Sequence, residues 1–399
     1  MTSARSPRPT LSRATPAVGH AAASTPTIDT PTEMLGGLSP SQFMRRHWQK
    51  KPLLIRNAFP GQAPLLSRQQ LFAMATDEAV ESRLIVHKDL GWVLKQGPLP
   101  RTALPPIQQP RWTLLVQGLD LHLEAAHALL QRFRFVPDAR LDDVMVSWAS
   151  DGGGVGPHFD SYDVFLLQAT GQRRWRIGRQ KDLSLQPDVP LKLLSHFEPE
   201  QEHLLGPGDM LYLPPRWAHD GVAEGGDCMT VSFGFRSPQR GGLAAELLQR
   251  MADDSEDETL YRDPKQAATA HPAAIPEGLR EFARQGLQRL LAERGSLECA
   301  LGEVMTEPKP RVWFEEPEQA WQVGALRLDR RTRMMYDERH VFINGESFHA
   351  GGADARLMRR LADQRAVSDN EVRRASADAQ TLLSDWFEAG WLHAMPAEA

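Results

Sequence analysis

The feature that most restricts the fold of this chain is a succession of short apolar segments between residues 85 and 234, separated by clusters of glycine, proline and aspartate. Segments of this length, broken by turn-forming residues, are typical of the antiparallel strands of a β-sandwich or barrel. All of them are far shorter than the ~20 residues that a membrane-spanning helix needs, so no membrane contact is predicted. The expected strands lie at 112–116, 144–148, 164–167, 175–177, 210–213 and 229–235.

The N-terminal segment, residues 1–33, consists largely of proline, serine, threonine and alanine, and is predicted to be a disordered tail. So few large apolar side chains cannot offset the entropy that is lost when a chain becomes ordered. Its arginines would also suit a transit peptide, but it lacks the continuous apolar stretch of a secretory signal. A folded catalytic domain is predicted at 34–238, where Ser39 can cap a helix that is followed by a short strand at 53–55.

After residue 238 the pattern becomes helical, and we assign residues 239–305 to a helical region. An apolar stripe with spacings of three and four indicates an amphipathic helix. Two interpretations stay open: the stripe packs on the β core of its own chain, or it packs against its copy in a dimer. The stripe consists of Leu279, Phe282, Ala283, Gly286, Leu287, Leu290 and Leu291.

The last segment, residues 306–399, has an order of strands and helices that fits a winged-helix domain. Such domains often bind DNA, but acidic residues outnumber basic ones here, whereas phosphate binding requires an excess of positive charge. We therefore expect a structural or protein-contacting role and no direct DNA binding. The expected strands lie at 325–328 and 341–343, and an Asn344-Gly345 turn separates them from helices at 355–362 and 377–389.

The net charge and the cysteine content indicate which partners and which cellular compartment to expect. The net charge is −5, which gives no general attraction to nucleic acid or to an anionic membrane. Only two cysteines are present, Cys228 and Cys299, which are too few for a disulfide framework and do not form a CxxC motif for metal or redox chemistry. These features predict a protein of the reducing cytoplasm.

One motif carries the chemistry: a glycine-rich segment leads into His158-Phe159-Asp160 and then into an apolar strand. Residues two apart on a strand point to the same face, so His158 and Asp160 can bring an imidazole nitrogen and a carboxylate oxygen to one point. Further along, a glycine-proline turn, a strand and a proline-rich loop end at His219, which an antiparallel neighbour can place beside the first two. Two histidines and one carboxylate leave open coordination positions, as in non-haem Fe(II) oxygenases.

A strand between the two halves of this motif carries three arginines, in the segment Gln172-Arg173-Arg174-Trp175-Arg176. Alternation places Arg173 and Trp175 on one face and the other two arginines on the opposite face, and the sequence leaves open which face is inside. Burying a guanidinium without an anion is costly. An inward-facing arginine could hold the distal carboxylate of a dicarboxylate through two parallel hydrogen bonds. The alternative that all three arginines are exposed to solvent stays open.

The segment PHFDSYDVFLLQATGQRRWRIG, followed by GDMLYLPPRWAHDG, resembles the JmjC-type cupins among the 2-oxoglutarate oxygenases. In particular, it resembles the bacterial ribosomal oxygenases that hydroxylate an arginine side chain of a large-subunit ribosomal protein. The segment WTLLVQG at 112–118 and the order of β core, helical region and small C-terminal domain resemble that group as well. The resemblance implies an α+β fold with a double-stranded β-helix (cupin/JmjC jelly roll), a homodimer formed by the helical region, and a winged-helix-like C-terminal domain.

The resemblance also assigns the central residues of the site. His158, Asp160 and His219 match the Fe(II) ligands, and Arg173 matches the basic residue that binds the end carboxylate of 2-oxoglutarate. In this family the iron and the co-substrate 2-oxoglutarate use O2 to hydroxylate the substrate carbon, and succinate and CO2 are released.

Further residues are assigned from their places in the motifs. Thr230 and Ser232, on the strand after His219, are candidate hydroxyl partners of the co-substrate carboxylate. The chain departs from the family at Gln172, where another basic residue is expected, and in its longer tail. A cationic arginine substrate needs acidic and aromatic side chains at the mouth of the site. The candidates that flank the ligands are Asp151, Tyr162, Asp163 and Asp220.

Two other functions remain compatible with the sequence. A cupin can bind a divalent metal and a sugar as an isomerase or sensor without oxidation, and O2-dependent turnover of 2-oxoglutarate to succinate separates this function from an oxygenase. A ribosome assembly factor can keep the fold without activity, although the intact set of three ligands disfavours that reading.

Overall fold

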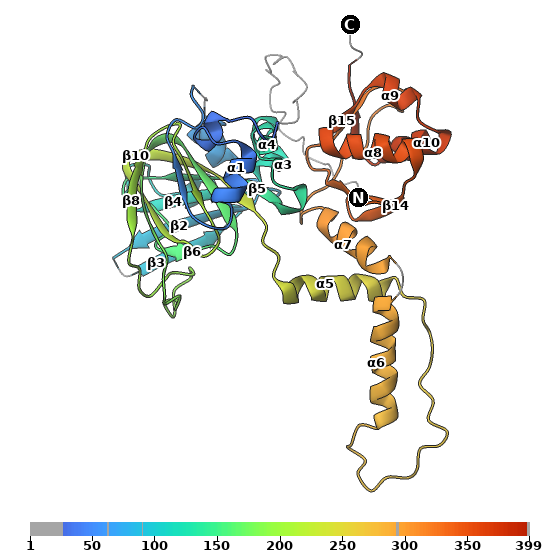
Figure 1. Cartoon of the computed structure of the whole chain (residues 1–399). Coiled ribbons are helices and arrows are strands. Elements are labelled where there is room, and N and C mark those ends of the chain that lie inside the picture. Colours follow the sequence, from blue (N-terminus) through green and yellow to red (C-terminus); the bar gives the residue numbers. More distant parts are fainter. Residues whose placement is uncertain (1–26, 62–63, 90, 293–294, 397–399) are drawn as a thin grey trace, which may run out of the picture.

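The computed structural model describes residues 27–61, 64–89, 91–292 and 295–396. A large antiparallel sheet module is followed by three helices and a smaller mixed module, and one of the helices projects from the body (Figure 1). Residues 1–26 of the predicted tail lie outside the described residues. The prediction of disorder is wrong for residues 27–33: the Ser41 amide donates to the Ile28 carbonyl oxygen at 2.8 Å, Thr32 forms a bridge with Leu38, and a 3-10 turn begins at Glu33 (Glu33–Leu35). Within the described ranges, no helix is long and apolar enough to cross a membrane.

The main sheet has ten strands, paired in antiparallel fashion in the order β1-β9-β7-β10-β5-β4-β2-β3, with β6 on β10 and β8 on β7. This arrangement forms the jelly-roll core that the sequence predicted. The strands are β1 (Leu53–Ile55), β2 (Ser82–Lys88), β3 (Gly91–Gln96), β4 (Trp112–Val116), β5 (Leu141–Ala149), β6 (His158–Phe159), β7 (Asp163–Gly178), β8 (Gln201–Leu205), β9 (Met210–Leu213) and β10 (Ala218–Phe235).

All six predicted strand segments lie in this sheet, but two of them, 164–167 and 175–177, belong to the single long strand β7. The sequence suggested two strands because Gly171 separates the apolar runs, and this residue has a φ of +64° in the structure. The partner strand β10 shifts its register between Glu224 and Met229 at the same level, so the pairing continues on both sides of the irregularity.

The two faces of β7 and β10 have different environments. One face carries Phe165 and Phe233 into the large core, where four helices of the N-terminal half cover the sheet. The first of these helices begins after Ser39, as the sequence predicted, and the Ser39 side chain forms a capping box with Gln42. The opposite face carries Leu166 and Trp175 into a separate apolar cluster inside the jelly roll. The helices are α1 (Pro40–Arg46), α2 (Arg68–Met74), α3 (Leu119–His122) and α4 (Glu124–Gln131).

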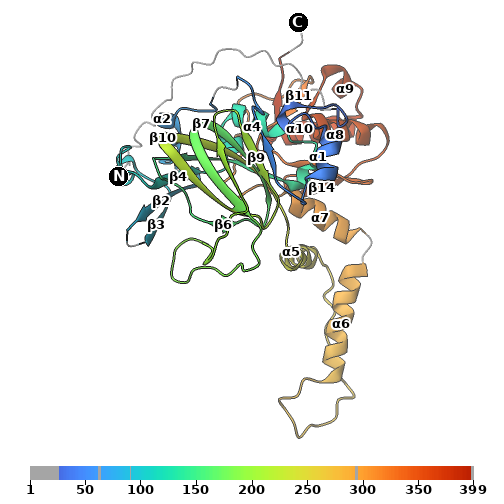
Figure 2. The ribbon, with the colours of Figure 1, turned by 60° about the vertical axis from the view of Figure 1, so that its left-hand side comes forward.

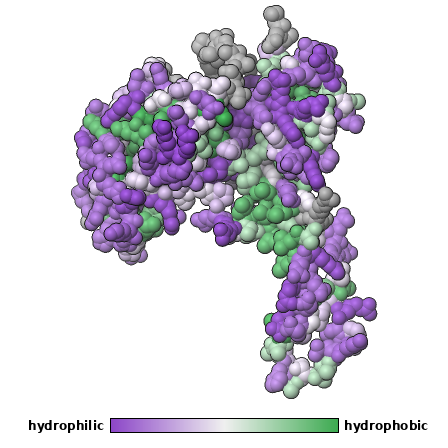
Figure 3. All heavy atoms as spheres, in the orientation of Figure 1, coloured by the Kyte–Doolittle hydropathy of each residue, from purple (hydrophilic) through white to green (hydrophobic). Residues whose placement is uncertain are grey.

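The helical region consists of α5 (Arg240–Asp253), α6 (Glu277–Ala292) and α7 (Ser296–Thr306), and α6 projects away from both modules (Figure 2). Helix α6 has no buried residues, so its apolar stripe does not pack on the β core of its own chain. Apolar side chains also gather on the surface over α5 and α7 (Figure 3). The exposed large apolar residues of the three helices are Leu248, Leu279, Leu287, Leu291, Leu297 and Leu301.

The C-terminal module contains two small three-stranded sheets and three helices around their own core, which includes Leu361, Leu383 and Trp386. Its elements confirm the predicted strands and helices and add several short ones. They are β11 (Leu326–Leu328), β12 (Met334–Tyr336), β13 (His340–Ile343), β14 (Glu346–His349), α8 (Gly352–Gln364), β15 (Ala366–Val367), α9 (Asp369–Arg373), α10 (Ala377–Glu388) and β16 (Leu392–Ala394).

Candidate metal and co-substrate site

Three side chains that can hold a metal ion meet where β6 pairs with the start of β10. His158 lies directly opposite His219 in the register of these strands, and the two imidazole centroids are 4.2 Å apart. Asp160 follows β6, and its Oδ2 lies 3.6 Å from His219 Nε2. One ligand atom from each residue lies within 4.8 Å of the others, and no second group of this kind occurs among the described residues.

Backbone contacts fix the orientation of both imidazoles. The Nδ1 atoms of His158 and His219 lie 2.8 Å from the carbonyl oxygen of Gly156 and 2.9 Å from that of Trp217. Because a carbonyl oxygen only accepts, Nδ1 carries the proton in each ring, and Nε2 presents its lone pair to the site. Burial, together with the neighbouring His158, lowers the pKa of His219 to about 4. The ring is therefore neutral at physiological pH, as metal coordination requires.

Arg173 points to the inner face of the jelly roll, which answers the question that alternation alone left open. It lies opposite Ala223 on β10, two residues from the Trp175 and Gly221 pair, and is 3% exposed. Its Nε and Nη2 atoms are buried and have no hydrogen-bond partner in the part of the chain that the structure describes. These two atoms form the edge of a guanidinium that binds a carboxylate through two parallel bonds. A buried dicarboxylate co-substrate therefore fits this position.

The other two arginines of this strand lie on the outer face, where each has an acidic partner. Arg174 is 2.7 Å from Glu202 and also pairs with Glu224, and Arg176 pairs with Asp220. These ion pairs occupy their guanidinium groups, so neither is available to a ligand inside the jelly roll.

Trp175 lines the space between Arg173 and His219. Its ring centroid is 5.7 Å from the Arg173 Cζ atom and 5.8 Å from the His219 ring centroid. Its Nε1 is a further buried donor without a partner within the described ranges. The ring rests on Gly221, where an added Cβ would lie only 2.5 Å from the nearest ring atom. Glycine is therefore required at this point for close approach.

The two hydroxyl candidates on β10 lie in the same region of the sheet, but they have different environments. Thr230 is 1% exposed, and its hydroxyl lies 3.0 Å from Gln168 Oε1, to which it donates. Ser232 is 7% exposed and lies opposite Leu166, a member of the inner cluster. Two further polar residues, Gln168 and Ser147, pair with Thr230 in the sheet register. The sequence carries no signal for them, because both lie within or beside apolar strand segments.

The four candidate substrate-binding residues differ in exposure: Asp151 and Tyr162 are exposed, whereas Asp163 and Asp220 are buried. Asp151 is exposed and accepts a hydrogen bond from the Gly225 amide, and Tyr162 is 37% exposed. Burial and the neighbouring Asp160 raise the pKa of the Tyr162 hydroxyl, which therefore stays protonated at neutral pH. The Asp151 contact lies six residues along β10 from His219, which corresponds to about 20 Å in an extended strand. Of these two residues, only Tyr162 therefore lies next to a metal ligand, Asp160.

Asp163 and Asp220 do not lie at the mouth of the site, where a substrate would enter. Asp163 is fully buried on the face of β7 that packs under the N-terminal helices, where Tyr212, Gln49 and Arg140 bind its carboxylate. Asp220 is bound by Arg176 on the outer face. The sequence could not separate these residues from the site, because proximity along a strand does not tell which face a side chain occupies.

The fold and the ligand set together define a JmjC-type 2-oxoglutarate oxygenase. The model of the JmjC domain matches residues 128–243, and the model of the ROXA-like winged helix matches residues 281–393. The ribosomal protein uL16 3-hydroxylase of Escherichia coli (strain K12) is 34% identical over 285 residues, which are 70% of this chain and 74% of that protein. A probable ribosomal oxygenase of Haemophilus influenzae is 39% identical over 210 residues, 52% of each chain.

Solved structures extend the similarity to most of the chain. The crystal structure of E. coli YcfD has a TM-score of 0.78 and 29% identity, and the match covers 89% of this chain and 98% of that one. A structure of YcfD, a ribosomal oxygenase, in complex with cobalt and 2-oxoglutarate has a TM-score of 0.76. The chain belongs to the ribosomal oxygenases with a JmjC domain. It is an oxygenase that uses 2-oxoglutarate and O2 with a metal ion, Fe(II), as cofactor.

Proposed function

We propose that the protein hydroxylates an arginine side chain of the large-subunit ribosomal protein uL16 in the cytoplasm. The observation that carries this proposal is the complete trio His158, Asp160 and His219 beside the unpaired inner edge of Arg173, on a chain that matches 74% of a uL16 3-hydroxylase. A non-catalytic assembly factor or a sugar-binding cupin would need no buried guanidinium that is free to take a dicarboxylate.

In this proposal His158, Asp160 and His219 hold the metal, and Arg173 holds the distal carboxylate of 2-oxoglutarate, with Thr230 and Ser232 near that carboxylate. When bound, the iron couples the oxidative decarboxylation of 2-oxoglutarate by O2 to the hydroxylation of a C–H bond. The chain itself binds and orients the reactants. The inner apolar cluster keeps water away, which strengthens the charged contact at Arg173 because the local dielectric constant is low.

The substrate is recognised, in this proposal, through Tyr162. The Tyr162 ring is exposed beside the metal ligand Asp160, where it can stack on a guanidinium through a cation–π contact. An arginine side chain would thus meet an aromatic face at the entrance.

The experiment that tests this function uses the purified protein with Fe(II), 2-oxoglutarate and a uL16 fragment. We expect succinate formation together with the gain of one oxygen atom on a single arginine of the fragment, located by tandem mass spectrometry. The matched control is the same fragment with that arginine replaced by lysine. Succinate formation with oxygen inserted elsewhere, or equal turnover of the lysine fragment, would contradict arginine as the target.

We also propose that the protein forms a homodimer through its helical region. The chain would then consist of a catalytic domain at 34–238, a dimerisation region at 239–305 and a winged-helix-like domain at 306–399. The support is the apolar face of α6, where Leu279, Leu287 and Leu291 are 39%, 56% and 56% exposed. A face of this size exposed to water is unfavourable, and a two-fold interface would cover it with its own copy. The winged-helix module then serves as a structural or protein-contacting part.

Leu287→Glu is expected to convert the dimer into monomers, because a two-fold axis places two new charges in one apolar interface. Multi-angle light scattering measures the mass of the particle directly. Gln288→Glu adds the same charge on the opposite side of α6 and is expected to leave the dimer intact. If wild-type protein is monomeric at micromolar concentration, or if Leu287→Glu stays dimeric, the proposed interface is wrong.

A further inference from the structure

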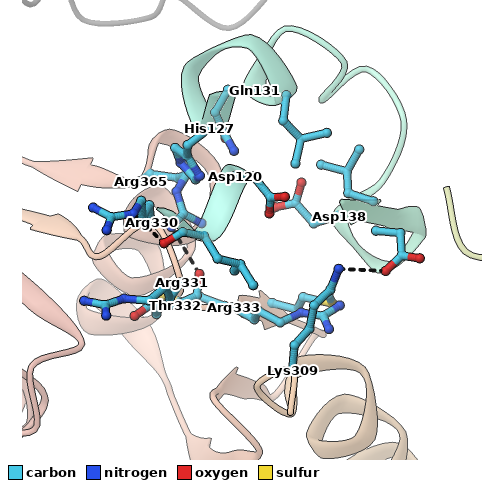
Figure 4. Close-up of a pocket in the computed structure, with 16 residues that line it drawn as sticks. Asp120, His127, Gln131, Asp138, Lys309, Arg330, Arg331, Thr332, Arg333 and Arg365 are labelled. Atoms are coloured by element: carbon cyan, nitrogen blue, oxygen red, sulfur yellow. Dashed lines mark hydrogen bonds and ion pairs between the residues drawn. The ribbon is translucent and has the colours of Figure 1, made fainter. Parts of the chain in front are cut away.

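A cavity lined by several charged side chains lies where the C-terminal module meets the sheet module, and none of the three metal ligands lines it. Its volume is about 70 Å³. One wall comes from α3, α4 and the start of β5, and the other from the β11–β12 turn and α8 (Figure 4). The cationic side chains that line it are Lys309, Arg330, Arg331, Arg333 and Arg365.

Three of these cations have no carboxylate within ion-pair distance among the described residues. Arg330 donates from Nε to the Leu121 carbonyl at 2.7 Å, and Arg333 makes only a long contact of 3.4 Å to the Glu307 carbonyl. Arg365 donates to the carbonyl oxygens of Asp329 and Thr332 at 2.7 and 3.1 Å. Carbonyl oxygens satisfy some of the donors, but they do not neutralise the positive charge.

The acidic side chains that line the cavity already have partners of their own. Asp142 is 3.0 Å from Lys309, and Asp138 is 2.6 Å from Arg134. Asp120 accepts a hydrogen bond from the Val144 amide, and burial raises its pKa, which disfavours its charged form. The arginines therefore leave an excess of positive charge at the cavity.

Arg365 is an example of a cavity arginine whose positive charge is not fully balanced by neighbouring negative charges. Burial and the nearby Arg134 lower its pKa to about 10, so the group keeps its charge at neutral pH at a cost. On the opposite wall, Gln131 Oε1 is buried without a hydrogen-bond partner in the described ranges. Since the two ends of an amide are assigned from their partners, the Gln131 side chain can turn its NH₂ group into the cavity as a donor.

We propose that this cavity binds a phosphate-type oxyanion, which bridges the C-terminal module and the sheet module. Each water needs about 10–15 Å³ of such space, so the cavity has room for a group of several heavy atoms. A tetrahedral oxyanion has four acceptor oxygens and can contact Arg330, Arg333 and Arg365 on one wall and the Gln131 amide on the other. The phosphate comes either from the free ion or from a nucleotide.

Calorimetric titration of the full chain with inorganic phosphate tests the site, with saturating 2-oxoglutarate present so that Arg173 is occupied. We expect saturable binding of one phosphate per chain, and Arg330→Gln and Arg333→Gln are each expected to weaken it roughly tenfold or more, the value of a charge-assisted hydrogen bond. A parallel titration with a nucleoside 5′-monophosphate identifies the source: tighter binding than inorganic phosphate indicates a nucleotide.

Arg374→Gln is the matched control, because this exposed arginine belongs to the same module and lies outside the cavity. It is expected to leave the phosphate affinity unchanged. Circular dichroism shows whether each variant is folded. A titration with chloride at equal ionic strength shows whether the effect of phosphate is specific or reflects general screening of charge. The proposal is overturned if phosphate binds no better than chloride, or if folded Arg330→Gln and Arg333→Gln proteins both bind it as tightly as the wild type.

Discussion

His158→Ala and His219→Ala are each expected to reduce the O2-dependent turnover of 2-oxoglutarate to background. Each change removes one of the three donors that meet within 4.8 Å, and the two that remain hold a divalent metal far more weakly. Succinate formation measures the turnover, and metal content after dialysis measures the affinity. His158 is the cleaner variant, because its ring is only half-buried whereas His219 is 3% exposed and belongs to the interior.

His196→Ala is the matched control, since this histidine is 79% exposed and lies outside the metal trio. It is expected to keep both the metal and the activity. Circular dichroism and thermal melting check that the ligand variants retain the fold. Full activity with iron still bound in either ligand variant would refute the assignment of the metal site.

Arg173→Ala is expected to raise the 2-oxoglutarate concentration needed for half-maximal turnover about tenfold to a hundredfold. The reason is the loss of a charge-assisted contact worth roughly 1.5–3 kcal/mol. Direct titration of the metal-loaded protein with 2-oxoglutarate measures the same loss without turnover. The maximal rate should fall less than the affinity, because in the proposed function Arg173 binds the end of the co-substrate that does not react.

Arg174→Ala removes the same charge from the outer face of the same strand and provides the control. Its guanidinium is held by Glu202 and Glu224, so the 2-oxoglutarate affinity should stay near the wild-type value. If Arg174→Ala weakens 2-oxoglutarate and Arg173→Ala does not, the inner edge of Arg173 is not the carboxylate site.

The metal trio could be found from sequence because its geometry follows from local rules. His158 and Asp160 are two residues apart beside a strand, and the proline-rich loop returns the chain so that His219 pairs with His158. The face on which Arg173 lies could not be found in this way. Alternation gives only relative faces, and the irregularity near Gly171 changes the phase of β7 between Leu166 and Trp175, which both point inward.

The same limit explains the incorrect assignment of Asp163 and Asp220 to the mouth of the site. Both flank the ligands in sequence, yet their partners come from distant segments, such as Tyr212 for Asp163 and Arg176 for Asp220. The cationic cavity could not be expected either, because its walls come from parts of the chain that are far apart in sequence. Contacts of this kind depend on how the modules pack, for which local patterns carry no signal.

The most direct test of the central claim is the intact mass of uL16 in ribosomes from cells with and without the gene for this protein. We expect uL16 from cells with the gene to be heavier by one oxygen atom, carried on an arginine side chain. A gene that encodes His158→Ala should not restore this mass difference. Identical uL16 masses in cells with and without the gene would contradict the account.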